Sequence, residues 1–230
     1  MKKLLAETLG TFALVFAGTG AIIINHESGG AVGHAGVALT FGLIILAMIY
    51  TFGDVSGAHF NPAVTFGFAV ARRFPWRQAP AYMGAQVVGA LCASAVLRFL
   101  FPGNAALGAT MPAGSDMQSF VLEVVLTVIL MLTILSVSTG AKEKGVTAGI
   151  AIGAVIGLEA MFAGPVCGAS MNPARSLGPA IVSGHFEHLW IYLLAPGMGA
   201  LLAVPLCIGV REPGCCGRTG VSLETEPRKP

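Results

Sequence analysis

Two short segments of this 230-residue chain carry the same polar signature, an asparagine followed by proline and alanine. Asparagine is favoured as the residue before a helix, and proline is favoured in a helix's first turn. Because capping uses the oxygen of the asparagine amide, its N–H groups remain free to donate. The signature residues are Asn61, Pro62, Ala63, Asn172, Pro173 and Ala174.

Several ionisable residues stand in apolar surroundings, where a charge is expensive and indicates a function. Arg175 directly follows the second signature, where the first signature has Val64. A functional role is favoured over a bracing or snorkelling arginine. Glu7 and Glu123 each begin an E-x-x-x-T match. They could relay protons, but the paired placement favours buried acceptors for backbone N–H groups, since buried charges need partners.

The signatures belong to an internal repeat. Residues 56–65 match residues 167–176 at five of ten positions, and the offset between Glu7 and Glu123 is similar to that between Asn61 and Asn172. Each half holds three apolar spans, and an odd number inverts the second half in the membrane. We therefore predict a first repeat over 1–115, an inverted second repeat over 116–210, and a cytoplasmic tail over 211–230.

The composition predicts an integral membrane protein. The chain is 55% hydrophobic and 10% charged, with a mean hydropathy of +0.79, whereas soluble domains are about 25% charged. A net charge of +2 excludes a strongly basic nucleic-acid binder. An N-terminal signal peptide is disfavoured by Glu7. Six stretches suit spans of about 20 residues: 8–25, 35–53, 78–97, 124–141, 145–174 (interrupted by Glu159) and 189–210.

The apolar stretches that follow the two signatures are too short to span a bilayer. We predict half-helices at 62–72 and 173–183, each entered by a loop that dips to mid-membrane. Such a loop is tolerated only where it is buried in protein or lines a wet cavity. A single Asn-Pro-Ala is usually just a helix start, but two in matching contexts and opposite orientations favour loops that meet near the midplane. The fold class predicted is all-α, with six transmembrane helices and two re-entrant half-helices.

The basic residues predict the orientation, because cytoplasmic segments are rich in Lys and Arg. With both termini in the cytoplasm, only Arg98 and Arg175 fall elsewhere. The cytoplasmic group is Lys2, Lys3, Arg72, Arg73, Arg77, Lys142, Lys144, Arg211, Arg218, Arg228 and Lys229.

The doubled signature, the arginine after the second copy and the paired E-x-x-x-T helices resemble the major intrinsic proteins, the aquaporin and glycerol-facilitator family, over residues 4–210. Residues 56–65 and 164–180, with 73–82, are most similar to its nodulin-like branch. The resemblance implies a passive channel for glycerol, metalloid acids such as arsenite, and water. It also implies a homotetramer in the plasma membrane with no cofactor. The short loops suggest a bacterial cytoplasmic membrane.

By the same resemblance, Phe41, Ala160, Ala169 and Arg175 form the narrowest part of the pore. Strict water channels usually have His at the second position and Thr or Cys at the third. Two alanines predict a wider and more apolar neck, which favours solutes larger than water. Glycerol facilitators usually set two aromatic residues against the arginine, and here Phe41 is the one present. The alternative is a water-selective channel.

Two further residues carry expectations. Glu159 adjoins Ala160; we expect it to turn away from the pore toward a neighbouring subunit or an outer loop, the alternative being a charge beside Arg175 that weakens cation exclusion. Cys167 lies two residues before Ala169, and a partial block by mercurials is expected. The pair Cys215-Cys216 in the tail is either acylated or inert.

Two other classes of function are disfavoured. A secondary transporter can share inverted repeats and broken helices, but it needs an ionisable coupling site at the midplane, and the pattern places none there. A membrane enzyme needs a nucleophile with its base or a metal set, and the five histidines fall in loops or at span ends.

Overall fold

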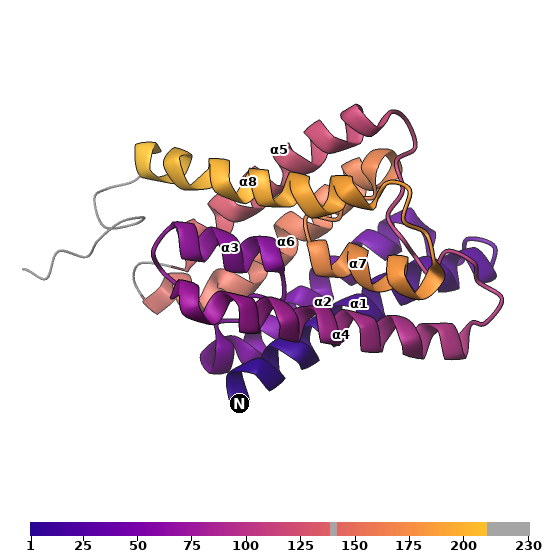
Figure 1. Cartoon of the computed structure of the whole chain (residues 1–230), viewed down its shortest axis with the longest axis horizontal. Helices are drawn as coiled ribbons and strands as arrows, with labels where there is room; N and C mark the ends of the chain where they lie inside the picture. Colours follow the sequence, from indigo (N-terminus) through magenta and orange to yellow (C-terminus); the bar gives the residue numbers. More distant parts are fainter. Residues whose placement is uncertain (139–141, 211–230) are drawn as a thin grey trace, which may run out of the picture.

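The computed structural model describes residues 1–138 and 142–210, and the side chains of 142–146 are not described. The expected tail, including Cys215-Cys216, therefore lies outside the described residues. Within the described part the chain forms helices and loops without strands (Figure 1). The elements are α1 (Lys2–Glu27), α2 (Gly33–Ser56), α3 (Pro62–Val70), a 3-10 turn η1 (Trp76–Gln78), α4 (Ala79–Leu100), α5 (Asp116–Val137), α6 (Lys142–Cys167), α7 (Pro173–Ser183) and α8 (Leu189–Val210).

Six of these helices are long and apolar enough to cross a membrane, which confirms the predicted fold class. They are α1, α2, α4 with η1, α5, α6 and α8. Several predicted ends are wrong. A charge-free stretch measures only the apolar part of a span, so α1 and α5 begin earlier than expected. The fifth stretch ends at Cys167 instead of 174, because Gly168 turns the backbone out of the helix with φ +83°.

The two short helices lie inside the bundle and point toward each other from opposite ends (Figure 1). Helix α7 spans 173–183 as predicted. Helix α3 ends two residues before the predicted 72, because Arg72 adopts a left-handed φ of 59°. Asn61 and Asn172 are the N-caps of α3 and α7, and proline occupies the first turn of each.

The packing repeats itself between the halves. Helix α1 packs on α4 and α2, and α5 packs on α8 and α6 in the same way. Each half-helix crosses to the other half, α3 onto α8 and α7 onto α4, while α2 meets α6. An exchange of the halves therefore leaves the pattern of helix contacts unchanged.

Glycines set the closest crossings. A Cβ on Gly89 of α4 would lie 2.3 Å from the carbonyl oxygen of Thr8, and one on Gly199 of α8 would lie 2.6 Å from that of Val124. Small residues of this kind let membrane helices approach closely, where packing replaces the hydrophobic effect. In each crossing pair one helix carries a buried glutamate: α1 carries Glu7, and α5 carries Glu123.

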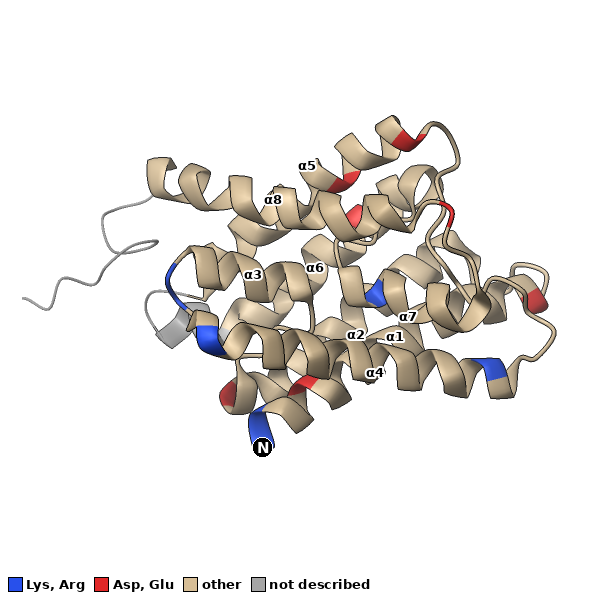
Figure 2. Cartoon of the chain, viewed as in Figure 1, with Lys and Arg blue, Asp and Glu red and all other residues tan. Residues whose placement is uncertain are grey.

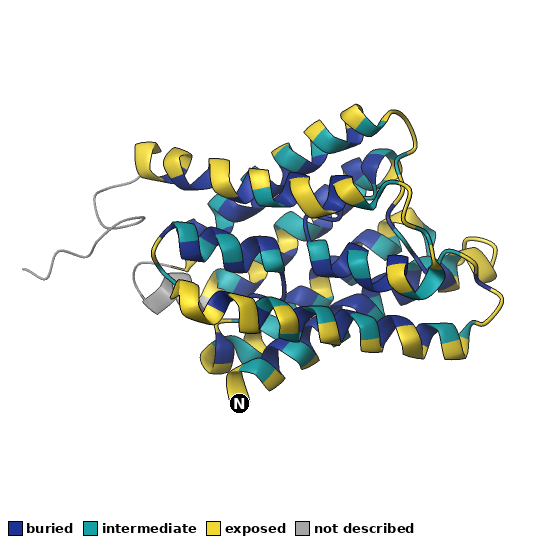
Figure 3. Ribbon diagram, in the orientation of Figure 1, coloured by how far each residue is buried: buried dark blue, intermediate teal, exposed yellow. Residues whose placement is uncertain are grey.

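The outward faces of the helices are exposed and apolar, whereas buried residues gather inside (Figure 3). Soluble monomers rarely expose contiguous apolar patches of more than a few hundred Å². Charged residues lie mainly toward the ends of the bundle (Figure 2). This distribution fits a multi-pass membrane protein surrounded by lipid.

Candidate functional site

Two loops at the centre of the bundle hold the backbone in an unusual conformation. In each loop, a glycine and two non-glycine residues adopt a left-handed φ. A left-handed conformation costs about 1–2 kcal/mol for a residue that carries a Cβ. These loops therefore need support from outside themselves. The residues are Gly57, Ala58 and Phe60 before α3, and Gly168, Ala169 and Met171 before α7.

Glu7 of α1 supplies that support to the first loop. Its Oε1 accepts from the backbone N–H of His59 (3.0 Å) and from the hydroxyl of Ser56 (2.6 Å). Its Oε2 accepts from the N–H of Phe60 (2.8 Å) and from Nε2 of Gln86 (2.7 Å). The carboxylate is fully buried, and each oxygen has two donors.

Glu123 of α5 does the same for the second loop. Its oxygens accept from the N–H groups of Ser170 (2.7 Å) and Met171 (2.8 Å). These two positions correspond in the repeat to those held by Glu7. The structure therefore brings both carboxylates onto the loop backbones, and charge-assisted hydrogen bonds of this kind are stronger than neutral ones.

Asn61 and Asn172 meet across the boundary between the halves. The Oδ1 of each caps its own half-helix, accepting from Ala63 (2.8 Å) and from Ala174 (3.0 Å) respectively. Nδ2 of Asn61 donates to the carbonyl of Met171 (2.7 Å), and Nδ2 of Asn172 donates to that of Phe60 (2.9 Å). An amide has two N–H groups, so one N–H of each asparagine is engaged and one is left. The expectation that both N–H groups of each amide are free is therefore wrong for one of the two.

A cavity of about 730 Å³ runs beside these loops. Helices α2 and α6 run antiparallel, and each lines the cavity with every fourth residue. Each of these two rows of residues forms a stripe that spans about 18 Å at 1.5 Å per residue. Both asparagines lie on its wall. The stripes are Phe41, Ile45, Ile49 and Gly53 of α2, and Ala148, Ile152, Ile156 and Ala160 of α6.

The four residues expected to form the neck all line this cavity, at its end remote from Asp54. Arg175 is buried, with 3% of the residue exposed, and its Nη1 donates to the carbonyl of Gly108 (2.8 Å). Its Cζ lies 5.1 Å from the centroid of the Phe41 ring, within the range of a cation–π contact. Ala160 and Ala169 contribute only methyl groups to the cavity wall.

Several supporting residues escaped the sequence analysis. The hydroxyl of Tyr82 donates to the carbonyl of Ser56 (3.0 Å), and that of Tyr192 donates to the carbonyl of Cys167 (2.7 Å). These tyrosines are 110 residues apart, which is close to the repeat offset, so an alignment of the third spans would have found them. Gly108 carries no signal in the sequence, because its contact uses only a backbone carbonyl.

The expectation for Glu159 is right in one part and wrong in the other. The side chain turns away from the pore, since it does not line the cavity. It is buried, with 1% exposed, so it does not face a neighbouring subunit, and no described outer-loop residue bonds its carboxyl group. Leu158 and Phe162 occupy the outward face of α6, and Glu159 lies about 100° around the helix from Leu158. Neither carboxyl oxygen has a hydrogen-bond partner among the described residues, and the side chain is not on the cavity wall.

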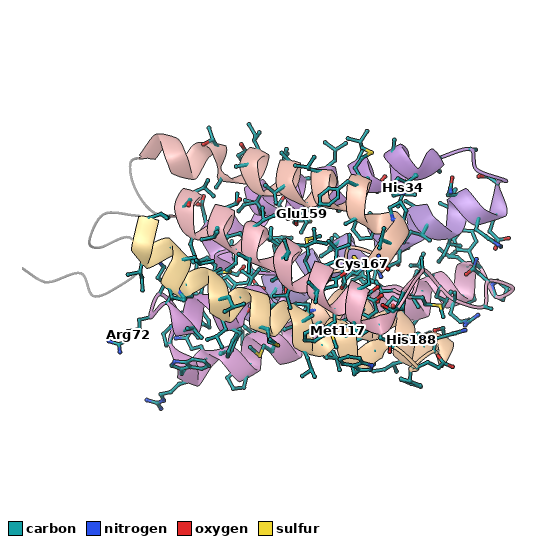
Figure 4. All side chains as sticks on the ribbon, turned by 90° about the horizontal axis from the view of Figure 1, so that it is seen from above. His34, Arg72, Met117, Glu159, Cys167 and His188 are labelled. Atoms are coloured by element: carbon teal, nitrogen blue, oxygen red, sulfur yellow. The ribbon has the colours of Figure 1, made fainter. Side chains whose placement is uncertain are left out.

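The position of Cys167 also argues against the expected mercurial block. Its side chain is fully buried and absent from the cavity wall. Its Sγ lies 3.6 Å from the carbonyl oxygen of Ala163 and 3.4 Å from the backbone nitrogen of Ala169, so the thiol bonds within the bend that ends α6. Cys167 is labelled in Figure 4. A mercurial in the cavity would not reach it.

Six spans and two half-helices surround a cavity that is lined by polar loops. This arrangement defines a membrane channel for small solutes, and the similarity of the chain to known proteins agrees with it. The family model of the major intrinsic proteins matches residues 1–206, and the chain belongs to this family. Its members are channels, so this protein is not an enzyme.

Similar proteins include plant and parasite channels. Aquaporin NIP1-1 of Oryza sativa subsp. japonica is 50% identical over 87% of this chain and 71% of its own length. Nodulin-26 of Glycine max is 48% identical over 87% of this chain and 74% of its own. The X-ray structure of the aquaglyceroporin from Plasmodium falciparum has a TM-score of 0.81 and 26% identity, and it covers 90% of this chain and 93% of that one. The sequence relatives are plant proteins, so the expected bacterial membrane finds no support in them.

Proposed function

We propose that this protein is a passive channel for glycerol, metalloid acids such as arsenite, and water. The observation that carries the proposal is the pair of methyl groups at the neck, Ala160 and Ala169, opposite the Phe41 ring and Arg175. Pore diameter and the hydrogen-bonding groups on the wall set selectivity in pores of the aquaporin type. Small side chains at two of four positions leave room for a solute with a carbon skeleton or three hydroxyl groups.

Exclusion of protons and other cations follows from three features of the site. The N-termini of α3 and α7 meet at the asparagines, and each carries about half a positive charge. The remaining N–H groups of Asn61 and Asn172 orient a water by its oxygen, so that it does not pass a proton along a file. Arg175 adds a full charge at the neck and a donor for the solute.

The setting of the channel is part of the proposal. We place both termini in the cytoplasm, because α1 begins and α8 ends at the same end of the bundle (Figure 1), where basic segments gather. The membrane is the plasma membrane, and the assembly is a homotetramer with one pore in each chain. The apolar outer faces supply surface for contact with lipid and with other copies.

The test is stopped-flow light scattering on proteoliposomes that contain the purified protein, with empty liposomes as the control. Glycerol uptake well above the control, with modest water flux, supports the proposal, and arsenite uptake extends it to metalloid acids. The variant Ala160→His, which places a ring in the neck, should lose glycerol uptake before water flux. Fast water flux with glycerol excluded would replace the proposal with a water-selective channel.

A further inference from the structure

A proline interrupts the hydrogen bonds of α6 close to the neck. Pro165 lies inside this helix. Proline has no backbone N–H, and its ring presses against the carbonyl of the residue four positions earlier. That residue is Met161, which directly follows Ala160. The carbonyl of Met161 therefore loses its helical donor at the position where α6 contributes to the neck.

A side chain from α2 supplies a donor to that carbonyl. Nε2 of His34 lies 2.6 Å from the oxygen of Met161. A carbonyl only accepts, so the contact is a hydrogen bond with the ring proton on Nε2. His34 is in the first turn of α2 and is 127 residues away from Met161 along the chain. Figure 4 shows it beside the last turns of α6.

Gly164 makes room for this contact. A Cβ on Gly164 would lie 3.0 Å from Cε1 of His34, which is tighter than ordinary van der Waals contact. The Met161 carbonyl without its helical donor, the absent side chain at Gly164 and the ring of His34 thus fit together at one place between α2 and α6. The carbonyl of Gly164 keeps its own donor, the N–H of Gly168 (3.0 Å). The histidine therefore replaces only the N–H that Pro165 lacks.

The hydrogen bond ties together the two helices that carry the neck. On α2, Phe41 lies seven residues, or about two turns, after His34. On α6, Ala160 adjoins the bonded carbonyl, and the helix then leads into the loop that carries Ala169. The position of three of the four neck residues thus depends on how the end of α6 sits against α2.

We propose that His34 is a positioning residue for solute selection, which holds the proline-interrupted end of α6 against α2. This inference rests on the proposed function, because it concerns which solutes pass the neck. In this arrangement, loss of the donor frees the segment after Ala160 to shift, and the width of the neck varies. The ring itself does not line the cavity, so it acts through α6 and not by contact with the solute.

The test is a mutant cycle between His34 and Pro165, read as the ratio of glycerol to water permeability in proteoliposomes. An ordinary hydrogen bond biases a two-state arrangement about fivefold, so we expect His34→Ala to change the ratio by about twofold to fivefold. Pro165→Ala restores a peptide N–H for Met161. In that background, His34→Ala should have no further effect.

Three measurements keep the result interpretable. His34→Gln offers an amide N–H and should restore the wild-type ratio. His26→Ala removes a histidine at the same end of the bundle, whose side chain is 78% exposed, and should change nothing. Gel filtration in detergent shows whether each variant is folded, and if His34→Ala does not fold, His34→Gln and the Pro165→Ala background carry the test.

An unchanged ratio in His34→Ala, or the same change in both backgrounds, would overturn the inference. If the wild type conducts water but no glycerol, the proposed function fails on its own. The cycle is then read on water permeability, where coupling between His34 and Pro165 supports the positioning role and its absence rejects it.

Discussion

Gly18 of α1 lies directly behind the ring of Phe41, which we propose as part of the neck, and its substitution should narrow the pore. A Cβ at Gly18 would lie 2.1 Å from Cε1 of Phe41 and 2.5 Å from both Cδ1 and Cζ. Ordinary contact begins at 3.4 Å, so the ring in Gly18→Ala must retreat by about 1.3 Å, the difference between the two distances. The ring lines the cavity and faces the Arg175 guanidinium, so the free space lies on the pore side.

The energetic cost sets the size of the effect. Inserting one methyl into a packed interior costs about 1–3 kcal/mol. If about 1 kcal/mol of that strain must be relieved each time glycerol passes, glycerol permeability falls about fivefold, since 1.36 kcal/mol corresponds to a factor of ten in rate. Water is smaller and should lose less, so the ratio of glycerol to water permeability falls.

Stopped-flow light scattering on proteoliposomes measures both permeabilities in one preparation. Gly20→Ala is the matched control on the same helix, because its Cβ would meet only Cδ2 of Leu97, at 3.4 Å. Shrinking the ring in Gly18→Ala with Phe41→Leu should restore glycerol uptake. Equal glycerol permeability in Gly18→Ala and wild type, with the protein folded, would refute the placement of Phe41 at the neck.

Three further predictions concern buried polar groups. Glu123→Gln leaves one loop N–H, that of Ser170 or Met171, without an acceptor, which lowers the free energy of unfolding by about 1–3 kcal/mol. The midpoint of thermal unfolding in detergent should therefore fall by several degrees. An unchanged midpoint would show that the loop does not need the carboxylate. Glu159→Leu removes a carboxyl group that has no hydrogen-bond partner among the described residues. The same assay should therefore show an equal or higher unfolding midpoint. A clearly lower midpoint would reveal a hydrogen-bond partner of the carboxyl group. Water flux should be insensitive to mercurials in wild type as in Cys167→Ser, and inhibition in wild type alone would place the thiol within reach of the pore.

The architecture was predictable because it depends on repeated and local signals. Hydropathy over about 20 residues predicts the spans, and the matching segments around Asn61 and Asn172 predict the half-helices. Helix ends were less predictable, since Lys2 and Asp116 extend helices beyond the apolar stretch and Gly168 ends one inside it.

The site was predictable only where side chains carry the chemistry. The positions of Glu7 and Glu123 follow from the repeat, but their partners are backbone N–H groups that every residue offers. The contact from Arg175 to the Gly108 carbonyl leaves no trace in residue type. The orientation of Glu159 depends on which face of α6 turns inward, and a helix that packs on both α2 and α5 has apolar residues on several faces.

The hydrogen bonds of the two asparagines also bear on how such a molecule is put together. Each loop is braced by a carboxylate from its own half, whereas each asparagine amide donates into the opposite half. The junction therefore has the self-complementary form of a two-fold interface between identical subunits. In architectural terms the single chain is a covalently linked dimer, in which each half can shape its own loop but neither alone encloses the passage.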